Sequence, residues 1–335
     1  EGVGSVPAYR GAAYVVIEDL DLGRFGNRVP QFSFEVVRPD QDAADSAISD
    51  LAQGVQAVAL MPGTGEYALA TDPVALNSGF GISRMANVNS PSGKTDFLTS
   101  FEALEEELPN CSSALLIVSW FGSDLRCGSC VLKPKVVQAA ADGRGMPWSV
   151  SGLTRETADL IAELDGRPVY GGTPSDQSVV QAIRKMREAG KDVVFYPIIL
   201  MEQLAGNGLP DPYGNSDEQA ILPWRGRSTT AVSPGQNGSP DGSLDARAEV
   251  DAFFGEADVS SFQPGNGAVG YSGPEEWSYR RFILHYAHLC ALAGGVDAFC
   301  IGSEMRGLTQ IRGEDNSFPS IEQLKTLAAE VRVIL

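Results

Sequence analysis

The stretch Val296-Asp297-Ala298-Phe299-Cys300-Ile301-Gly302-Ser303-Glu304-Met305 decides the fold that we expect for this chain. Small and apolar residues lead into a glycine and then into one carboxylate, Glu304. A short apolar run bounded by turn residues is typical of a strand buried on both faces, as in a parallel sheet. We therefore expect Glu304 at the carboxyl end of a strand, the edge where (β/α) barrels carry their chemistry. The alternative is that Glu304 caps or salt-bridges the next loop.

The composition is that of a globular protein. The chain has 335 residues, of which 43% are hydrophobic and 20% charged. This length suggests two domains, or one large barrel with an appendage. No apolar run reaches the roughly 18 residues of a membrane span, so we expect none. The chain begins Glu1-Gly2-Val3-Gly4, with neither a starting Met nor a signal peptide, and we expect it to be processed or excerpted from a longer protein.

The net charge narrows the classes of partner. The formal charge is −18 and the sequence pI is about 4.5. Binding of nucleic acid through phosphate neutralisation needs clustered Lys and Arg, so this mode is disfavoured. The charge fits a highly soluble surface, or the wall of a channel that repels DNA and lets it slide past.

The predicted secondary structure changes along the chain. Residues 1–60 predict a β segment with strands at 12–17 and 31–37, followed by a helix over 42–60, and residues 61–95 predict a linker with short strands. From Asp96 helices and strands alternate. We expect helices at 97–108, 157–164, 175–188, 276–293 and 321–335, and strands at 114–122, 168–172, 192–201 and 296–302.

This alternation predicts an α/β fold with about four β/α units, the first half of a (β/α) TIM-barrel-like domain over residues 96–335. A doubly wound nucleotide-binding sheet is the competitor, but no Gly-x-Gly-x-x-Gly follows the first strand. Residues 205–275 interrupt the rhythm with a long Gly- and Pro-rich insertion. We expect either a lid or partner-binding arm over the strand ends, or a mobile insertion.

Three carboxylates follow predicted strands: Asp124, Glu202 and Glu304. Glycoside hydrolysis needs two carboxyl groups that face each other across the scissile bond. Glu304 is the best candidate for the acid/base, since a buried strand before it would desolvate the carboxyl. Glu202 or Asp124 could supply the second carboxylate, although each could equally cap a loop.

Aromatic and cationic residues near the same strand ends are candidates for substrate binding. Trp120, Trp224 and Tyr170 could stack on sugar rings, or they could simply fill the core. Arg225, in the run Pro223-Trp224-Arg225-Gly226-Arg227, could pair with an acid or bind an anionic glycan.

The cysteines and histidines give weak signals. Cys127-Gly128-Ser129-Cys130 is half of a zinc site without a second half, so a disulfide or loop thiols are the main interpretations, and Cys127 and Cys130 are only weak candidates for metal ligands. His285 and His288 are three residues apart on a predicted helix, where packing is expected. No cofactor motif is present, and we expect no cofactor.

Several runs together resemble gene transfer agent and siphophage tail-tip proteins. The segments Pro7–Val16 and Phe25–Pro30 resemble the hub segment of siphophage tail tips. Five later runs are similar to the TIM-barrel-like domain of gene transfer agents: Leu98–Leu104, Trp120–Cys127, Tyr170–Asp176, Pro223–Arg227 and Gly302–Leu308.

The resemblance implies a tail-tip hub protein (megatron, or host specificity protein) in a virion-like particle that is extracellular after release. It implies a homotrimer around the tail axis that contacts other tail proteins, a barrel that meets host cell-wall or capsule glycan, and DNA only as transit cargo. In related glycosidases Asn-Glu ends the fourth strand, with the Glu as acid/base. Here Ser303 replaces that Asn, so Ser303 is a substrate-binding candidate. The expected function is that of a structural tail-tip component whose barrel contacts cell-surface glycan during attachment or DNA delivery. The alternative is an active retaining glycoside hydrolase that degrades peptidoglycan or capsule, with Glu304 as acid/base.

Overall fold

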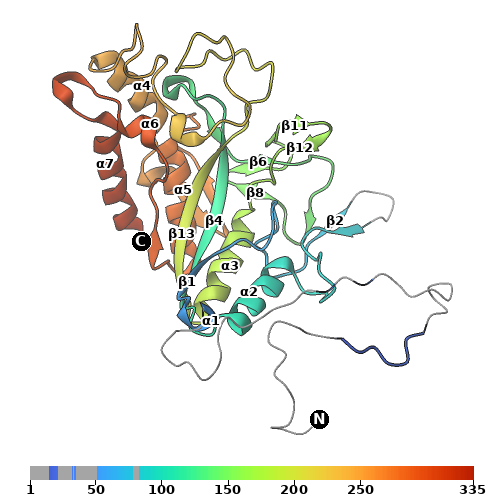
Figure 1. The fold of residues 1–335 in the computed structure, drawn as a ribbon. Helices are drawn as coiled ribbons and strands as arrows, with labels where there is room; N and C mark the ends of the chain where they lie inside the picture. Colours follow the sequence, from blue (N-terminus) through green and yellow to red (C-terminus); the bar gives the residue numbers. More distant parts are fainter. Residues whose placement is uncertain (1–14, 22–31, 33, 35–50, 78–82) are drawn as a thin grey trace, which may run out of the picture. The chain divides into compact units, whose positions relative to one another are not determined.

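The computed structural model describes residues 15–21, 32, 34, 51–77 and 83–335 (Figure 1). The chain divides into two compact units, Glu1–Asp50 and Leu51–Leu335. In the first unit, Val15, Val16 and Ile17 are exposed and form no strand, so the expected all-β segment is not confirmed. The remaining residues of the two expected strands, Phe32 and Phe34 excepted, lie outside the described residues.

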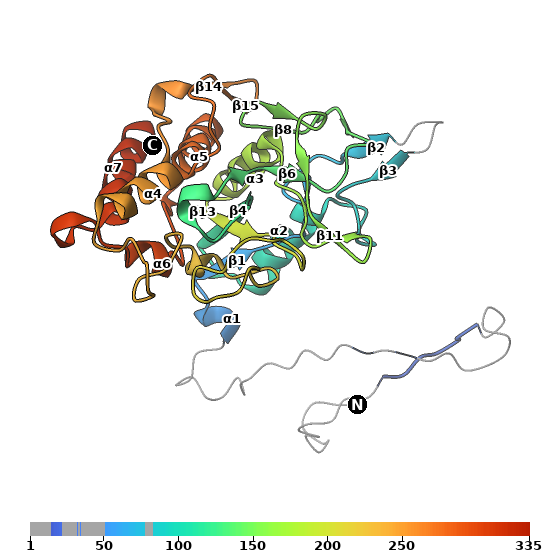
Figure 2. The same ribbon diagram turned by 90° about the horizontal axis from the view of Figure 1, so that it is seen from above.

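The second unit is built on one parallel sheet. Its strands are β1 (Ala57–Leu60), β4 (Ser113–Gly122), β13 (Asp192–Met201) and β16 (Ala298–Phe299), hydrogen-bonded in that order. The short β5 (Leu132–Lys133) runs antiparallel beside the end of β4. The strands follow one another in space as they do in the sequence (Figure 2). A doubly wound sheet would reverse its order at a switch point, so this winding is that of a barrel.

Side chains alternate between the two faces of β4 and β13, because successive residues of a strand point to opposite sides. Trp120 and Phe195 are buried on the face that packs against α5 (Tyr279–Ala293). On the other face, Ile117 and Ile198 are half-buried. The main core therefore lies between the sheet and the helices of one layer.

Helix ends agree with the sequence signals. The hydroxyl of Ser175 caps α3 (Asp176–Glu188) by accepting from the N–H of Ser178, and Ser278 caps α5 in the same way. Gly294, with φ 108°, ends α5 in the left-handed region that glycine adopts without strain.

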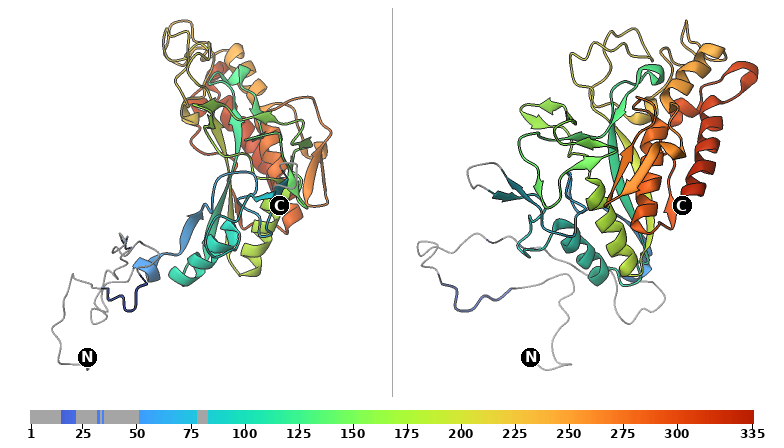
Figure 3. Two further views of the ribbon diagram at one scale, coloured as in Figure 1. Left: turned by 90° about the vertical axis from the view of Figure 1, so that its right-hand side faces the viewer. Right: turned by 180° about the vertical axis from the view of Figure 1, so that it is seen from behind.

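The remaining elements surround this sheet (Figure 3). The helices are α1 (Leu51–Gly54), α2 (Asp96–Glu107), α4 (Leu244–Phe254), α6 (Arg306–Thr309) and α7 (Pro319–Ile334), with 3-10 turns η2 (Cys127–Ser129), η3 (Arg225–Arg227), η4 (Val259–Ser261) and η5 (Glu314–Asn316). The short strands are β2 (Ala75–Asn77), β3 (Ser83–Met85), β6 (Lys135–Val136), β7 (Gly143–Arg144), β8 (Ser149–Val150), β9 (Leu153–Thr154), β10 (Asp159–Leu160), β11 (Glu163–Leu164), β12 (Arg167–Pro168), β14 (Phe262–Gly265) and β15 (Ala268–Tyr271).

The α/β class and the parallel central sheet are confirmed, but two elements were assigned wrongly. Residues 57–60 are the edge strand β1, not the end of a helix, because they pair in parallel with β4. The expected strand at 168–172 is not in the sheet: only Arg167–Pro168 is extended, in an antiparallel hairpin with β11. Pro168, Gly171 and Gly172 offer few side chains that a sheet could bury.

Two further predictions were also wrong. Residues 157–164 form the short strands β10 and β11 rather than a helix. The strand that leads to Glu304 is only Ala298–Phe299, and residues 300–305 form an irregular turn beyond it. Pairing with β13 ends at Phe299, and the left-handed φ of Glu304 turns the chain away from an extended path.

The insertion at 205–275 is anchored on the strand ends. The N–H of Thr229 donates to the carbonyl of Leu125 at 2.8 Å, and the N–H of Leu222 donates to the carbonyl of Gln203 at 2.8 Å. These bonds place parts of the insertion beside the strand ends, whereas its strands β14 and β15 pack on α5. The lid or partner-binding arm stays a prediction. Among the helices of the described residues, none has the length and apolar character needed to cross a membrane.

Candidate functional site

The parallel sheet brings three carboxylates to one edge. Asp124 follows β4, Glu202 directly follows β13, and Glu304 lies shortly beyond β16. Since these strands are parallel neighbours, their carboxyl ends face the same way. This is the edge where barrel proteins place their functional side chains.

Glu304 forms a compact polar cluster with residues of the insertion. Its Oε2 accepts a hydrogen bond from Nε1 of Trp224 at 2.5 Å. The same oxygen forms an ion pair with Nη2 of Arg225 at 3.0 Å. The same Arg225 nitrogen donates to Oγ of Ser303 at 3.3 Å. Four residues that the sequence singled out separately therefore lie together, and we call Ser303, Glu304, Trp224 and Arg225 the rim cluster.

Two glycines allow the rim cluster to form. A Cβ on Gly226 would lie 2.5 Å from Cε2 of Trp224, so the indole ring rests directly on the backbone of η3. A Cβ on Gly307 would lie 3.1 Å from the carbonyl of Gly226, so α6 approaches η3 closely. Larger residues at either position would separate the two segments that carry the cluster.

The rim cluster is accessible to a ligand. The side chain of Trp224 is 48% exposed and that of Glu304 is 47% exposed. The expectation that a buried strand desolvates Glu304 is therefore wrong. Glu304 also has φ 54°, a left-handed conformation that costs a non-glycine residue about 1–2 kcal/mol. Strained backbone of this kind persists where the surrounding structure imposes it, often at functional sites.

The other two carboxylates are buried and neutralised. Asp124 is 3% exposed; it pairs with Nη2 of Arg126 at 2.6 Å and accepts from Nε2 of Gln219 at 2.7 Å. Glu202 is 8% exposed; it forms an ion pair with Lys135 and accepts from the N–H of Ala162 at 3.2 Å. Both therefore hold loops in place, the alternative that the sequence left open.

The two remaining aromatic candidates occupy different positions. Trp120 is completely buried against Phe282, His285 and Tyr286 of α5, so it cannot stack on a sugar ring. The alternation of strand faces determines this, because Trp120 points to the helix side of β4. Tyr170 instead lines a pocket beside the strand ends, and its hydroxyl donates to the carbonyl of Met201 at 3.2 Å.

The cysteine motif forms a buried turn. Cys127 and Cys130 are free thiols in and after η2, and burial raises the pKa of Cys127 and raises that of Cys130 to about 12. Within the described residues no group of three or more His, Cys, Asp or Glu side chains is arranged to hold a metal ion.

Sequence reasoning missed a buried ionic cluster near this edge. Arg155 is 2% exposed, and its Nε bonds to Oδ1 of Asp142 at 2.9 Å and its Nη2 to the hydroxyl of Tyr67 at 3.2 Å. Its Nη1 pairs with Oε1 of Glu66 at 3.4 Å. Recognising 57–60 as a strand would have placed Glu66 at the carboxyl edge, but no local pattern points to Arg155.

The second unit is an α/β structure with a mainly parallel sheet and a polar cluster at the carboxyl edge of its strands, as in TIM-barrel-like domains. Residues 277–335, which include Ser303 and Glu304 but not Trp224 or Arg225, match the family model of the GTA TIM-barrel-like domain. No curated protein matches the chain. A solved structure of a GH113 β-1,4-mannanase complex is similar at 13% identity and a TM-score of 0.30. That likeness covers 70% of this chain and 45% of the mannanase chain, and at this TM-score it supports no argument about activity.

Proposed function

We propose that this protein is a structural component of the tail-tip hub of a phage-like particle, a gene transfer agent, and that its barrel binds cell-surface glycan. The match of residues 277–335 to the GTA TIM-barrel-like domain supports the association with such particles. The observation that carries glycan binding is the rim cluster. It offers an exposed indole face, a carboxylate and a hydroxyl at the carboxyl edge of the sheet, the combination that sugars use for stacking and hydrogen bonds.

Binding fits the geometry better than cleavage. A glycosidase needs two carboxyl groups that face each other across the scissile bond. Of the three carboxylates at this edge only Glu304 is exposed, and its Oε2 is already bonded to Trp224 and Arg225. The two other carboxylates of the edge, Asp124 and Glu202, are only 3% and 8% exposed, so neither is offered to a substrate at the surface.

Exposed apolar residues in the first unit support the structural part of the proposal. Val15 is 62% exposed, Val16 69% and Phe34 60%. Residues of this type favour strands, and a segment with no strand partner of its own can add to the sheet of another chain. Neighbouring tail proteins, or further copies of the chain in a trimer, would cover them.

The test is sedimentation of the protein with insoluble peptidoglycan and with capsule polysaccharide. We expect the wild type to pellet and Trp224→Ala to lose at least tenfold in affinity. Ile221→Ala is the matched control, since Ile221 is 53% exposed on the same loop but outside the cluster. Equal pelleting of all three proteins would count against the rim cluster as a glycan site.

The same samples test the enzymatic alternative. Soluble reducing sugar is measured after incubation with the wild type and with Glu304→Gln. We expect no release from either protein. Release by the wild type that Glu304→Gln abolishes would make the barrel a glycoside hydrolase with Glu304 as its acid/base.

A further inference from the structure

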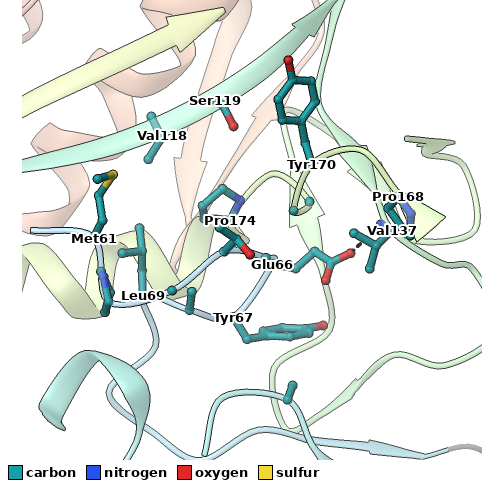
Figure 4. A pocket seen from close by; sticks show the side chains of 18 of the residues that line it. Met61, Glu66, Tyr67, Leu69, Val118, Ser119, Val137, Pro168, Tyr170 and Pro174 are labelled. Carbon is teal, nitrogen blue, oxygen red and sulfur yellow. Dashed lines mark hydrogen bonds between the residues drawn. The ribbon is translucent and has the colours of Figure 1, made fainter. Parts of the chain in front are cut away.

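A pocket of about 750 Å³ lies apart from the rim cluster, against the half-buried face of β4 and β13 (Figure 4). Its sheet wall includes Ile117, Ser119 and Ile198, and the segments 60–69 and 168–174 supply most of the other walls. In Figure 4, Ser119 and Tyr170 lie on one side, with Tyr67 and Leu69 opposite. This volume falls within the range of small-molecule sites in proteins.

Glycine contacts hold two walls of the pocket together. A Cβ on Gly171 would lie 2.6 Å from the backbone nitrogen of Gly65, and a Cβ on Gly172 would lie 2.7 Å from Cδ of Glu66. The segment that carries Tyr170 therefore touches the segment that follows β1, backbone against backbone. This contact fixes Glu66 in the wall.

Glu66 is the buried polar group of the pocket. It is 7% exposed, and its Oε1 accepts from the N–H of Val137 at 2.8 Å and from Nη1 of Arg155. Within the described part of the chain, its Oε2 and the Oγ of Ser119 make no hydrogen bond, and both residues line the pocket. A carboxylate oxygen accepts hydrogen bonds and a hydroxyl both donates and accepts them, so both atoms can bond to a ligand's hydroxyl groups.

The charges of the pocket fit a neutral ligand. Two of its lining residues are charged: Glu66, which is buried and paired with Arg155, and Arg84, which is exposed on β3. One negative and one positive side chain leave the lining without net charge, so it favours neither a cation nor an anion. The walls of Ile117, Ile198 and Leu200 match an apolar ring face, and the ring of Tyr170 offers a stacking surface.

We propose that this pocket binds a neutral sugar unit, with Glu66 Oε2 and Ser119 Oγ bonded to its hydroxyl groups. The inference rests on the proposed glycan-binding function and adds to it a second site and the charge class of the sugar. The rim cluster would bind the glycan at the exposed edge, and the pocket would take one of its neutral units.

The test uses small soluble probes that need only the pocket. Affinity is measured by calorimetry for neutral tetramers of N-acetylglucosamine and of glucose, and for an anionic tetramer of galacturonic acid. We expect the wild type to bind at least one neutral tetramer at least tenfold more tightly than the anionic one. No binding of either neutral tetramer, or tighter binding of the anionic one, would overturn the inference.

Filling the pocket provides the decisive variant. Ser119→Leu places an apolar side chain in the cavity, and we expect it to weaken tetramer binding at least tenfold. Ser113→Leu, the same change at the other end of β4 and outside the pocket wall, is the control. If Ser119→Leu does not affect tetramer binding, the sugar binds elsewhere, and the proposal that this pocket binds it is wrong.

The outcomes separate the two proposals. In one outcome, pelleting with polysaccharide depends on Trp224 but Ser119→Leu does not change tetramer binding. This result would support the proposed function and contradict the sugar site in the pocket. Tetramer binding that depends on Ser119, without pelleting of the wild type, would support the pocket and remove the role of the rim cluster.

Discussion

The guanidinium of Arg225 and the carboxylate of Glu304 lie 3.0 Å apart and connect the insertion to the end of strand β16. The pair holds the Glu304 carboxylate beside the exposed indole of Trp224, whose Nε1 donates to the same Oε2. A carboxylate accepts hydrogen bonds from sugar hydroxyls, and an indole stacks on sugar rings. This arrangement is the physical reason to expect a glycan-binding edge.

The indole of Trp224 should lose its position if Gly226 gains a side chain. Gly226→Ala places a methyl group 2.5 Å from Cε2 of Trp224, so the ring must move away from η3. We expect glycan pelleting to fall about as far as in Trp224→Ala, while the circular dichroism spectrum is unchanged. Gly214→Ala is the control, because no heavy atom lies within 4 Å of its new Cβ. Unchanged pelleting by Gly226→Ala would show that the ring's position is unimportant.

The sequence predicted long elements better than the site. The apolar runs of β4 and β13 and the capped helices α3 and α5 carry local signals strong enough to place them. β1 has only four residues, and pairing with β4, not local preference, makes it a strand. The proximity of Trp224 to Glu304 depends on the path of a long insertion, which residue spacing does not encode.

Arg155 should be the most important polar residue for stability near the pocket. Its replacement by Met leaves Glu66 buried without its cation, and breaking a buried pair in this way costs about 3–5 kcal/mol. Arg144→Met is the control, since Arg144 is exposed on β7. Urea unfolding gives both free energies of unfolding. A loss below about 1 kcal/mol for Arg155→Met, the size seen for exposed pairs, would mean that the cluster adds little.

Asp142 should make the free energy of unfolding depend on pH in the acid range. Burial acts to raise the pKa of its carboxyl, but hydrogen bonds from the N–H of Trp148, from Arg155 and from Tyr67 outweigh it, and the pKa is lowered. A carboxyl whose folded pKa lies below its unfolded value, about 3.9, stabilises the protein above that pH. The contribution is lost as the pH falls through the folded pKa.

The comparison of wild type with Asp142→Asn isolates this contribution. We expect the wild type to be more stable at pH 7 and the difference to shrink as the pH falls below about 4. The change should be small, because the Asp142 side chain is 37% exposed. Urea midpoints at pH 7, 5, 4 and 3 provide the measurement. A difference that is constant across this range would assign the effect of the substitution to packing rather than to charge.

The five cysteines should react in two classes. Cys111, Cys127, Cys130 and Cys290 are buried, and Cys300 alone is partly exposed. Burial raises the pKa of Cys300 as well, so its thiolate fraction at neutral pH is low and its reaction should accelerate as the pH rises. With a hydrophilic disulfide reagent we expect one slow thiol in the native protein and five in denaturant. Cys300→Ser should remove the native reaction. Only three reactive thiols in denaturant, with a mass lower by two hydrogens, would instead show one disulfide among the five cysteines.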